Sequence, residues 1–215
     1  MLFIINIVFL FSNDTIKRII IKHSLKIEKV KKLHSAPKQN QEIATNEAIC
    51  VSISRSGEAA RVQSLNPGDF LRVVEESIIT WINIPVEDIN VDAEKIACQF
   101  GFDPNLVKTL LTGYLAYYHD IDVNLGLMFP AIRIEEQQVK TRPLLVLIKK
   151  NLILTIHDLK VVRLMRFSRY AGIFMKKIPL ETKWNDRITI ILNRIIDENN
   201  DRNFDGLRYI AEEAD

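Results

Sequence analysis

The sequence predicts an α/β (α+β) fold, in which helices cover both faces of one mixed β-sheet and a long helix ends the chain. Three observations support this prediction. Apolar segments with strand character alternate with helical segments as far as about residue 158, without a regular βαβ repeat. Two apolar runs, residues 144–148 and 152–156, are continuous rather than alternating, which is typical of strands covered on both faces. After residue 159 the pattern is helical only.

The first predicted elements are a β-hairpin and a short helix. Residues 48–54 alternate apolar and polar side chains, Gly57 lies in a turn, and residues 60–65 resume the extended pattern. Together these signals predict a hairpin. After the helix, a short apolar strand is predicted at residues 78–84, with Pro85 ending it.

Two further helices and three strands are predicted next. Asp92 can cap a helix that ends at Gly101, and Pro104 begins another. Residues 123–129 alternate and predict a strand that continues past Pro130. The two continuous apolar runs, divided by a polar turn, then predict a hairpin.

The end of the chain is predicted to be helical. One helix reaches Tyr170, and a long final helix begins near Thr182 and continues, with a polar interruption at Asn199-Asn200, through Ile210. An apolar stripe at helical spacing on this final helix is expected to pack in the core or against another subunit. The stripe consists of Ile188, Ile191, Leu192, Ile195 and Ile196.

Composition excludes several classes of protein. Hydrophobic residues make up 47% of the chain and charged residues 26%, as in globular rather than disordered proteins. The net charge is +2, but residues 1–45 carry eight basic and three acidic side chains, which leaves 21 basic and 24 acidic ones in the rest. A mildly acidic body argues against nucleic acid as a partner, because phosphate binding needs a clustered positive face.

The first 45 residues are predicted to form a poorly ordered basic leader and linker, and the folded domain is predicted over residues 46–215. Residues 1–11 are almost wholly apolar, but a helix needs ~20 such residues to cross a bilayer. The positive charges of the leader follow this apolar run, whereas the positive charges of a signal peptide precede its apolar run. The alternative is an interfacial anchor, with the apolar run lying in the membrane surface. No direct membrane span is expected in this chain.

No catalytic residue or cofactor is predicted. The four histidines and seven glycines include no G-x-S-x-G and no glycine-rich phosphate loop. Cys50 and Cys98 lie far apart without metal-ligand spacing and are expected to be reduced thiols. The weak candidates for metal ligands are Asp120 and Asp122, which would lie on one side of a strand. The alternative for this pair is a solvated strand edge.

Four segments follow one another in a definite order. They are T-W-I-N-I at residues 80–84, F-G-F-D-P-N-L at 100–106, K-N-L-I-L-T-I-H-D at 150–158, and a helix at 186–199. This series resembles the cytoplasmic domain of the CorA-like magnesium/cobalt (divalent cation) transporter family, with its motifs W-I-D/N-I, F-G-x-H-P-L and K-N-x-L-x-T-x-H-E. The positions that match the family are Trp81, Asn83, Phe100, Gly101, Pro104 and His157.

The resemblance implies a non-catalytic regulatory domain that gates Mg²⁺/Co²⁺ transport in a homopentamer at the cytoplasmic face of the cell membrane. In that family the last helix continues into a stalk and two membrane helices, so the chain is expected to be a soluble fragment cut before the stalk. The alternative is a stand-alone soluble homologue that acts as a binding or assembly module. Two apolar runs beyond Asp215 in the reading frame would favour the first.

One departure from the family concerns Mg²⁺. After the F-G-x-H-P-L segment the family usually carries an acidic pair that helps to bind this ion between subunits, and the matching positions here are Lys108 and Thr109. A lysine does not ligate a hard cation, and one hydroxyl replaces a carboxylate poorly. Mg²⁺ is therefore expected at most as a weakly bound regulatory ion.

Overall fold

The computed structural model describes residues 46–113, 117–121, 124–135 and 138–214 of the 215-residue chain. The predicted leader, residues 1–45, lies outside the described residues, and so does Asp122. The division of the chain at residue 45 therefore stays a prediction.

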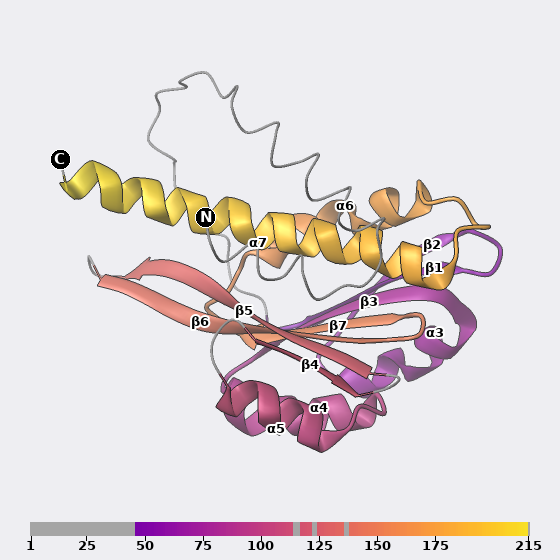
Figure 1. Cartoon of the computed structure of the whole chain (residues 1–215). Helices are drawn as coiled ribbons and strands as arrows, with labels where there is room; N and C mark the ends of the chain where they lie inside the picture. Colours follow the sequence, from indigo (N-terminus) through magenta and orange to yellow (C-terminus); the bar gives the residue numbers. More distant parts are fainter. Residues whose placement is uncertain (1–45, 114–116, 122–123, 136–137, 215) are drawn as a thin grey trace. The chain divides into compact units, whose positions relative to one another are not determined.

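One seven-stranded sheet organises the described residues (Figure 1). Its strand order is β2-β1-β3-β7-β6-β5-β4, and β3 and β7 are the one parallel pair among these strands. The strands are β1 (Ala48–Ser54), β2 (Ala59–Ser64), β3 (Ser77–Val86), β4 (Tyr117–Ile121), β5 (Asn124–Glu135), β6 (Gln138–Lys149) and β7 (Leu152–Asp158).

Helices cover both faces of the sheet. Figure 1 shows α4 and α5 on one face and α6 and α7 on the other. The helices are η2 (Pro67–Phe70), α3 (Leu71–Glu76), α4 (Ile89–Gln99), α5 (Pro104–Thr112), α6 (Leu164–Lys176) and α7 (Trp184–Ala214). The predicted fold class, a mixed sheet between helices that ends in a long helix, is confirmed.

The alternation of side chains along the strands produces two separate cores. On the α4/α5 face, Ile82 and Leu154 belong to an apolar cluster that includes Leu106 and Leu110 of α5. Gly126 of β5 lies under this cluster, because an added Cβ would come within 2.3 Å of Leu110 Cδ1. The opposite face buries Trp81 against Phe167 of α6, with 4.6 Å between their ring centroids.

The predicted first hairpin forms with a three-residue loop. Gly57 has a φ of 85°, its N–H donates to Ser54 O at 3.0 Å, and Ser54 N donates to Glu58 O at 2.9 Å. This is a type I turn followed by a left-handed residue, the usual geometry of such a loop.

Several predicted boundaries were wrong. Helix α4 begins at Ile89, because the Asp88 carboxylate accepts from Asn90 N at 2.9 Å, and Asp92 lies in its first turn. Strand β3 continues through Pro85, where its neighbour β1 has already ended and no N–H is needed on that side. Strand β6 is longer than predicted, and helix α6 ends later than predicted. The predicted persistence of α7 past the polar pair Asn199-Asn200 is confirmed, and the helix is continuous there.

Helix α7 is 31 residues long. Among the described residues, however, no helix combines the length and the apolar character that a membrane crossing requires.

Candidate functional site

Two of the recognised motifs meet at the parallel strands β3 and β7. The register pairs Asn83 with Thr155 and Pro85 with His157, so that odd-numbered side chains of both strands face α6 and α7. Trp81, Asn83, Thr155 and His157 are all buried there. Segments about 70 residues apart in the sequence thus form one polar cluster inside an apolar core.

Hydrogen bonds link the four side chains. Trp81 Nε1 donates to the Thr155 hydroxyl at 3.2 Å, and this hydroxyl lies 3.0 Å from Ile82 O and 2.8 Å from Asn83 Oδ1. The same Oδ1 lies 3.1 Å from His157 Nε2. The other ring nitrogen, Nδ1, lies 2.9 Å from the backbone oxygen of Asp158. We call these four residues the β3–β7 polar cluster.

The protonation state of His157 follows from its surroundings. Burial lowers its pKa, against a smaller opposing influence of Asp158, so the ring is neutral at physiological pH and carries one N–H. A backbone oxygen can only accept, which places that hydrogen on Nδ1. Nε2 then needs a donor. Asn83 Oδ1 lies there, and turning this side-chain amide by 180°, which exchanges its oxygen and nitrogen, supplies the donor.

The Thr155 hydroxyl accepts from Trp81 Nε1 and contacts Ile82 O and the Asn83 amide, and both ring nitrogens of His157 have partners. These atoms are engaged in internal hydrogen bonds rather than presented to a substrate. The cluster holds strands β3 and β7 in register. It is also connected to α6, because the Trp81 ring packs against the ring of Phe167. Its geometry suits a structural role rather than nucleophilic or acid–base catalysis.

The Phe100-Gly101-Pro104 segment forms the corner between α4 and α5. Phe102 N donates to Ala97 O at 3.1 Å and Gly101 N donates to Cys98 O at 3.0 Å, which is the Schellman arrangement with glycine at its left-handed position. Gly101 has a φ of 74°. At the start of α5, the Asp103 carboxylate accepts from Asn105 N at 2.7 Å and Pro104 occupies the first turn.

Strand β6 supports this corner through Lys149. Its ammonium donates to Phe100 O and lies 5.3 Å from the centroid of the Phe102 ring. Burial lowers the pKa of Lys149. A lysine at the last carbonyls of a helix is favourable because it offsets their partial negative charge, so this second motif is also structural.

Helix α7 is joined to α6 by a polar contact that the sequence did not suggest. The Tyr170 hydroxyl donates to the Glu198 carboxylate at 2.5 Å and accepts from Arg194 Nε at 2.6 Å, while Arg194 Nη2 donates to the same carboxylate. Glu198 is buried. Burial and the bond to Glu198 raise the pKa of Tyr170. A buried carboxylate with two donors is a strong, directional contact.

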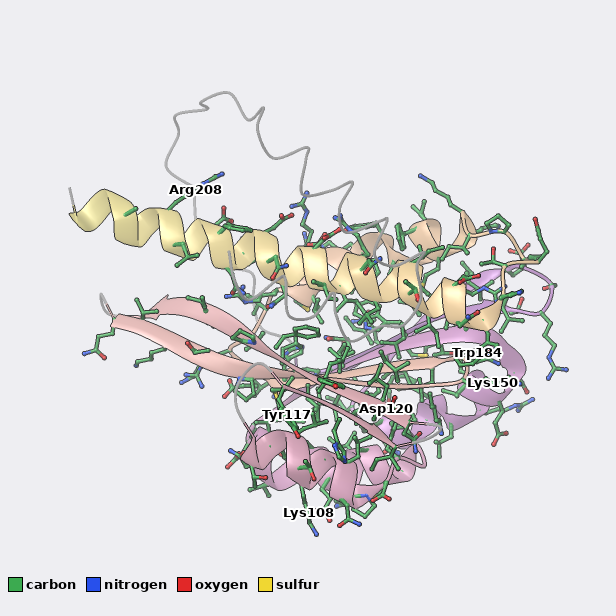
Figure 2. All side chains as sticks on the ribbon, in the orientation of Figure 1. Lys108, Tyr117, Asp120, Lys150, Trp184 and Arg208 are labelled. Atoms are coloured by element: carbon green, nitrogen blue, oxygen red, sulfur yellow. The ribbon has the colours of Figure 1, made fainter. Side chains whose placement is uncertain are left out.

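The candidate metal ligands are not assembled into a site within the described residues. Asp120 is exposed on β4 at the edge of the sheet (Figure 2), and its proposed companion Asp122 lies outside the described residues. No group of three or more His, Cys, Asp or Glu side chains there could hold a metal ion. Lys108 lies on the outer side of α5, 3.3 Å from the Glu94 carboxylate of α4.

The chain was compared with known proteins. Residues 76–215 match the model of a family described as CorA-like Mg²⁺ transporter protein. The complete CorA magnesium transporter from Methanocaldococcus jannaschii is 19% identical, with a TM-score of 0.57 over 79% of this chain and 49% of that one. The soluble domain of CorA from the same organism is 16% identical, with a TM-score of 0.56 over 80% of this chain and 62% of that one. No curated protein sequence matches.

At these identities the structural matches show the fold alone. The chain spans about half the length of the complete transporter that it matches.

Proposed function

The chain belongs to the family of CorA-like Mg²⁺ transporter proteins, and from that membership we propose that it is the cytoplasmic, non-catalytic domain of a divalent-cation transporter. The observation that carries the proposal is the family match, which includes β3, both structural motifs and all of α7. The shared fold of the CorA soluble domain supports it.

The chemistry of the described residues supports a role without catalysis. In the β3–β7 polar cluster the Thr155 hydroxyl and both ring nitrogens of His157 are engaged in internal hydrogen bonds, and burial lowers the pKa of the histidine so that it is neutral. Burial raises the pKa of the Cys50 thiol to about 12, so this cysteine is a poor nucleophile at neutral pH.

In the proposed role the domain gates transport through α7. The first half of α7 is anchored by Ile191 and Ile195, which are fully buried, and by the contact of Tyr170 with Glu198. The first half of α7, held in this way, moves with the sheet rather than independently of it, so a change in the packing of the domain would shift this part of the helix. Assembly as a homopentamer, at the cytoplasmic face of the membrane, is part of the proposal.

Mg²⁺ is proposed to act at most as a weak regulatory ligand of this domain. At the family's acidic positions the chain has Lys108, whose ammonium already pairs with Glu94, and a second cation would be repelled there. Transport of Co²⁺ besides Mg²⁺ is proposed on the same family grounds.

Reconstitution tests the proposed function. The polypeptide encoded by the complete reading frame that contains residues 1–215 is placed in liposomes loaded with a Mg²⁺-sensitive dye. We expect Mg²⁺ entry above that of empty liposomes. A reading frame that ends at Asp215, together with no entry, would contradict the proposal and favour a stand-alone binding or assembly module.

A further inference from the structure

The two halves of α7 are held to the sheet by different contacts. In the first half, Ile188, Ile191 and Ile195 are buried in the core. From Asn200 to Arg208 no residue is buried, and Phe204 and Leu207 are about half exposed. Apolar burial, which is the main force that docks helices on sheets, therefore contributes little to the second half.

Polar side chains dock the second half on a stretch of β5 that none of the described strands covers. Strand β4 pairs with β5 only from Asn124 to Met128, so the backbone beyond Met128 has no strand on that side among those described. Asn203 of α7 fills the position: its Nδ2 donates to Pro130 O at 3.1 Å and its Oδ1 accepts from Ile132 N at 2.9 Å. One amide thus reproduces the donor and acceptor that a neighbouring strand would offer.

Two more residues complete this contact. Asn199 Nδ2 donates to Pro130 O at 3.0 Å. Arg163, which precedes α6, donates to Asn199 O at 2.9 Å, to Asn203 Oδ1 at 2.7 Å and to Ile132 O. The distal part of α7 also approaches β5 closely, because a Cβ added at Gly206 would lie 3.7 Å from Ile132 Cγ2.

The docked position buries a charge at a cost. Arg163 is 5% exposed, yet its hydrogen-bond partners among the described residues are all neutral oxygens, and its Nε has none there. The pKa of Arg163 is lowered to about 10, mainly by burial and also by the nearby Arg202 and Arg133, whereas Asp205 opposes the shift. Because a buried charge without a counter-ion is unfavourable, release of this contact would recover solvation.

We propose that residues 200–214 form a detachable arm, which the side chains of Arg163 and Asn203 clamp to the open edge of β5 and which can release while the first half of α7 stays docked. Directional hydrogen bonds favour the docked position, and the buried guanidinium opposes it. The opposition of these two effects keeps the two positions close in free energy. The inference stands apart from the proposed function, although in a transporter such an arm would decide how firmly α7 follows the sheet.

Hydrogen exchange in the full chain tests the arm. We expect amides of residues 201–211 to exchange faster than those of residues 188–196 in the wild type, which identifies a local opening. Asn203→Ala should speed exchange of the arm by about tenfold without changing residues 188–196. Arg163→Met should act in the same direction, and Arg163→Lys should restore part of the protection.

Asn200→Ala is the matched control. It removes the same side chain from the same helix, at a position whose side chain makes no hydrogen bond within the described residues, and it should leave exchange unchanged. If Arg163→Met does not fold, the same exchange measurement is made on Asn203→Ala and Asn203→Ser alone, and both should speed exchange of the arm. The proposal is overturned if the whole of α7 exchanges as one unit in every variant, or if Asn203→Ala and Asn200→Ala behave alike. Neither result depends on whether the protein transports cations.

Discussion

The two helical layers attach to the same sheet by different chemistry. The α4/α5 layer rests on a continuous apolar cluster, whereas the α6/α7 layer combines apolar packing with three buried polar contacts: the β3–β7 polar cluster, the Tyr170–Arg194–Glu198 contact and the clamp of Arg163 and Asn203. Apolar packing gives stability without a preferred direction. Hydrogen bonds fix orientation, and a few substitutions can release them. The difference suggests that the first layer stabilises the domain and that the second sets the position of α7.

The largest effect on stability is expected in the apolar layer. Leu110→Ala should lower the free energy of unfolding by about 2–5 kcal/mol, because a fully buried side chain leaves a cavity. Urea denaturation measures it. Val91→Ala in the same layer is the control, since Val91 is 70% exposed, and it should cost less than about 0.5 kcal/mol. Similar losses for the two variants would show that this layer is not the stabilising one.

The next effect concerns the β3–β7 polar cluster. Thr155→Val keeps the shape of the side chain but removes the partner of Trp81 Nε1, which should cost about 1–3 kcal/mol because buried polar groups are left unsatisfied. Asn83→Leu should act similarly. The double variant should lose less than the sum of the two, since both act on one network. Additive losses would show that the two residues are not coupled.

A smaller, pH-dependent effect is expected from His157. Its pKa is lowered in the folded protein, so protons bind preferentially to the unfolded chain. Stability is then complete above the unfolded pKa of ~6.5 and is lost as the pH falls below it. Between pH 7.5 and 5.5 we expect a loss of about 1 kcal/mol. His157→Gln should flatten this slope, and an unchanged slope in that variant would assign it to another group.

The smallest effect is expected at Lys108. The ion pair with Glu94 is largely exposed, so Lys108→Ala should change stability by less than about 1 kcal/mol. Millimolar Mg²⁺ should raise the melting temperature only slightly above that in NaCl of equal ionic strength. A rise of many degrees that is specific to Mg²⁺ would mean that the domain holds a tight site.

The spacing of apolar residues along the sequence predicted much of this fold, because each helix or strand must bury one of its faces and therefore carries its own apolar pattern. The continuous runs of β6 and β7 and the apolar stripe of α7 are examples, and the corner at Gly101 followed from local backbone chemistry. The residue that caps a helix was harder to predict. Asp88 and Asp92 are chemically equivalent candidates for the N-cap of α4, and the structure uses Asp88.

The polar contacts of α7 could not be predicted in the same way. Asn199 and Asn203 look like an interruption of an amphipathic helix, because their partners are backbone atoms of β5 about 70 residues earlier. Arg163 lies within the helical pattern predicted after residue 159, whereas in the structure it immediately precedes α6. Such contacts depend on which strand edge is left uncovered, and that is decided only when the whole sheet has formed.

We propose that the polar layer couples the domain to α7 in a transporter. Mg²⁺ entry into liposomes tests it most directly, comparing wild type with Glu198→Gln in the protein of the complete reading frame. The substitution keeps the shape of the side chain but weakens its bonds to Tyr170 and Arg194. We expect entry to change by about fivefold or more while the melting temperature stays within a few degrees. Equal entry in the two proteins would contradict the claim.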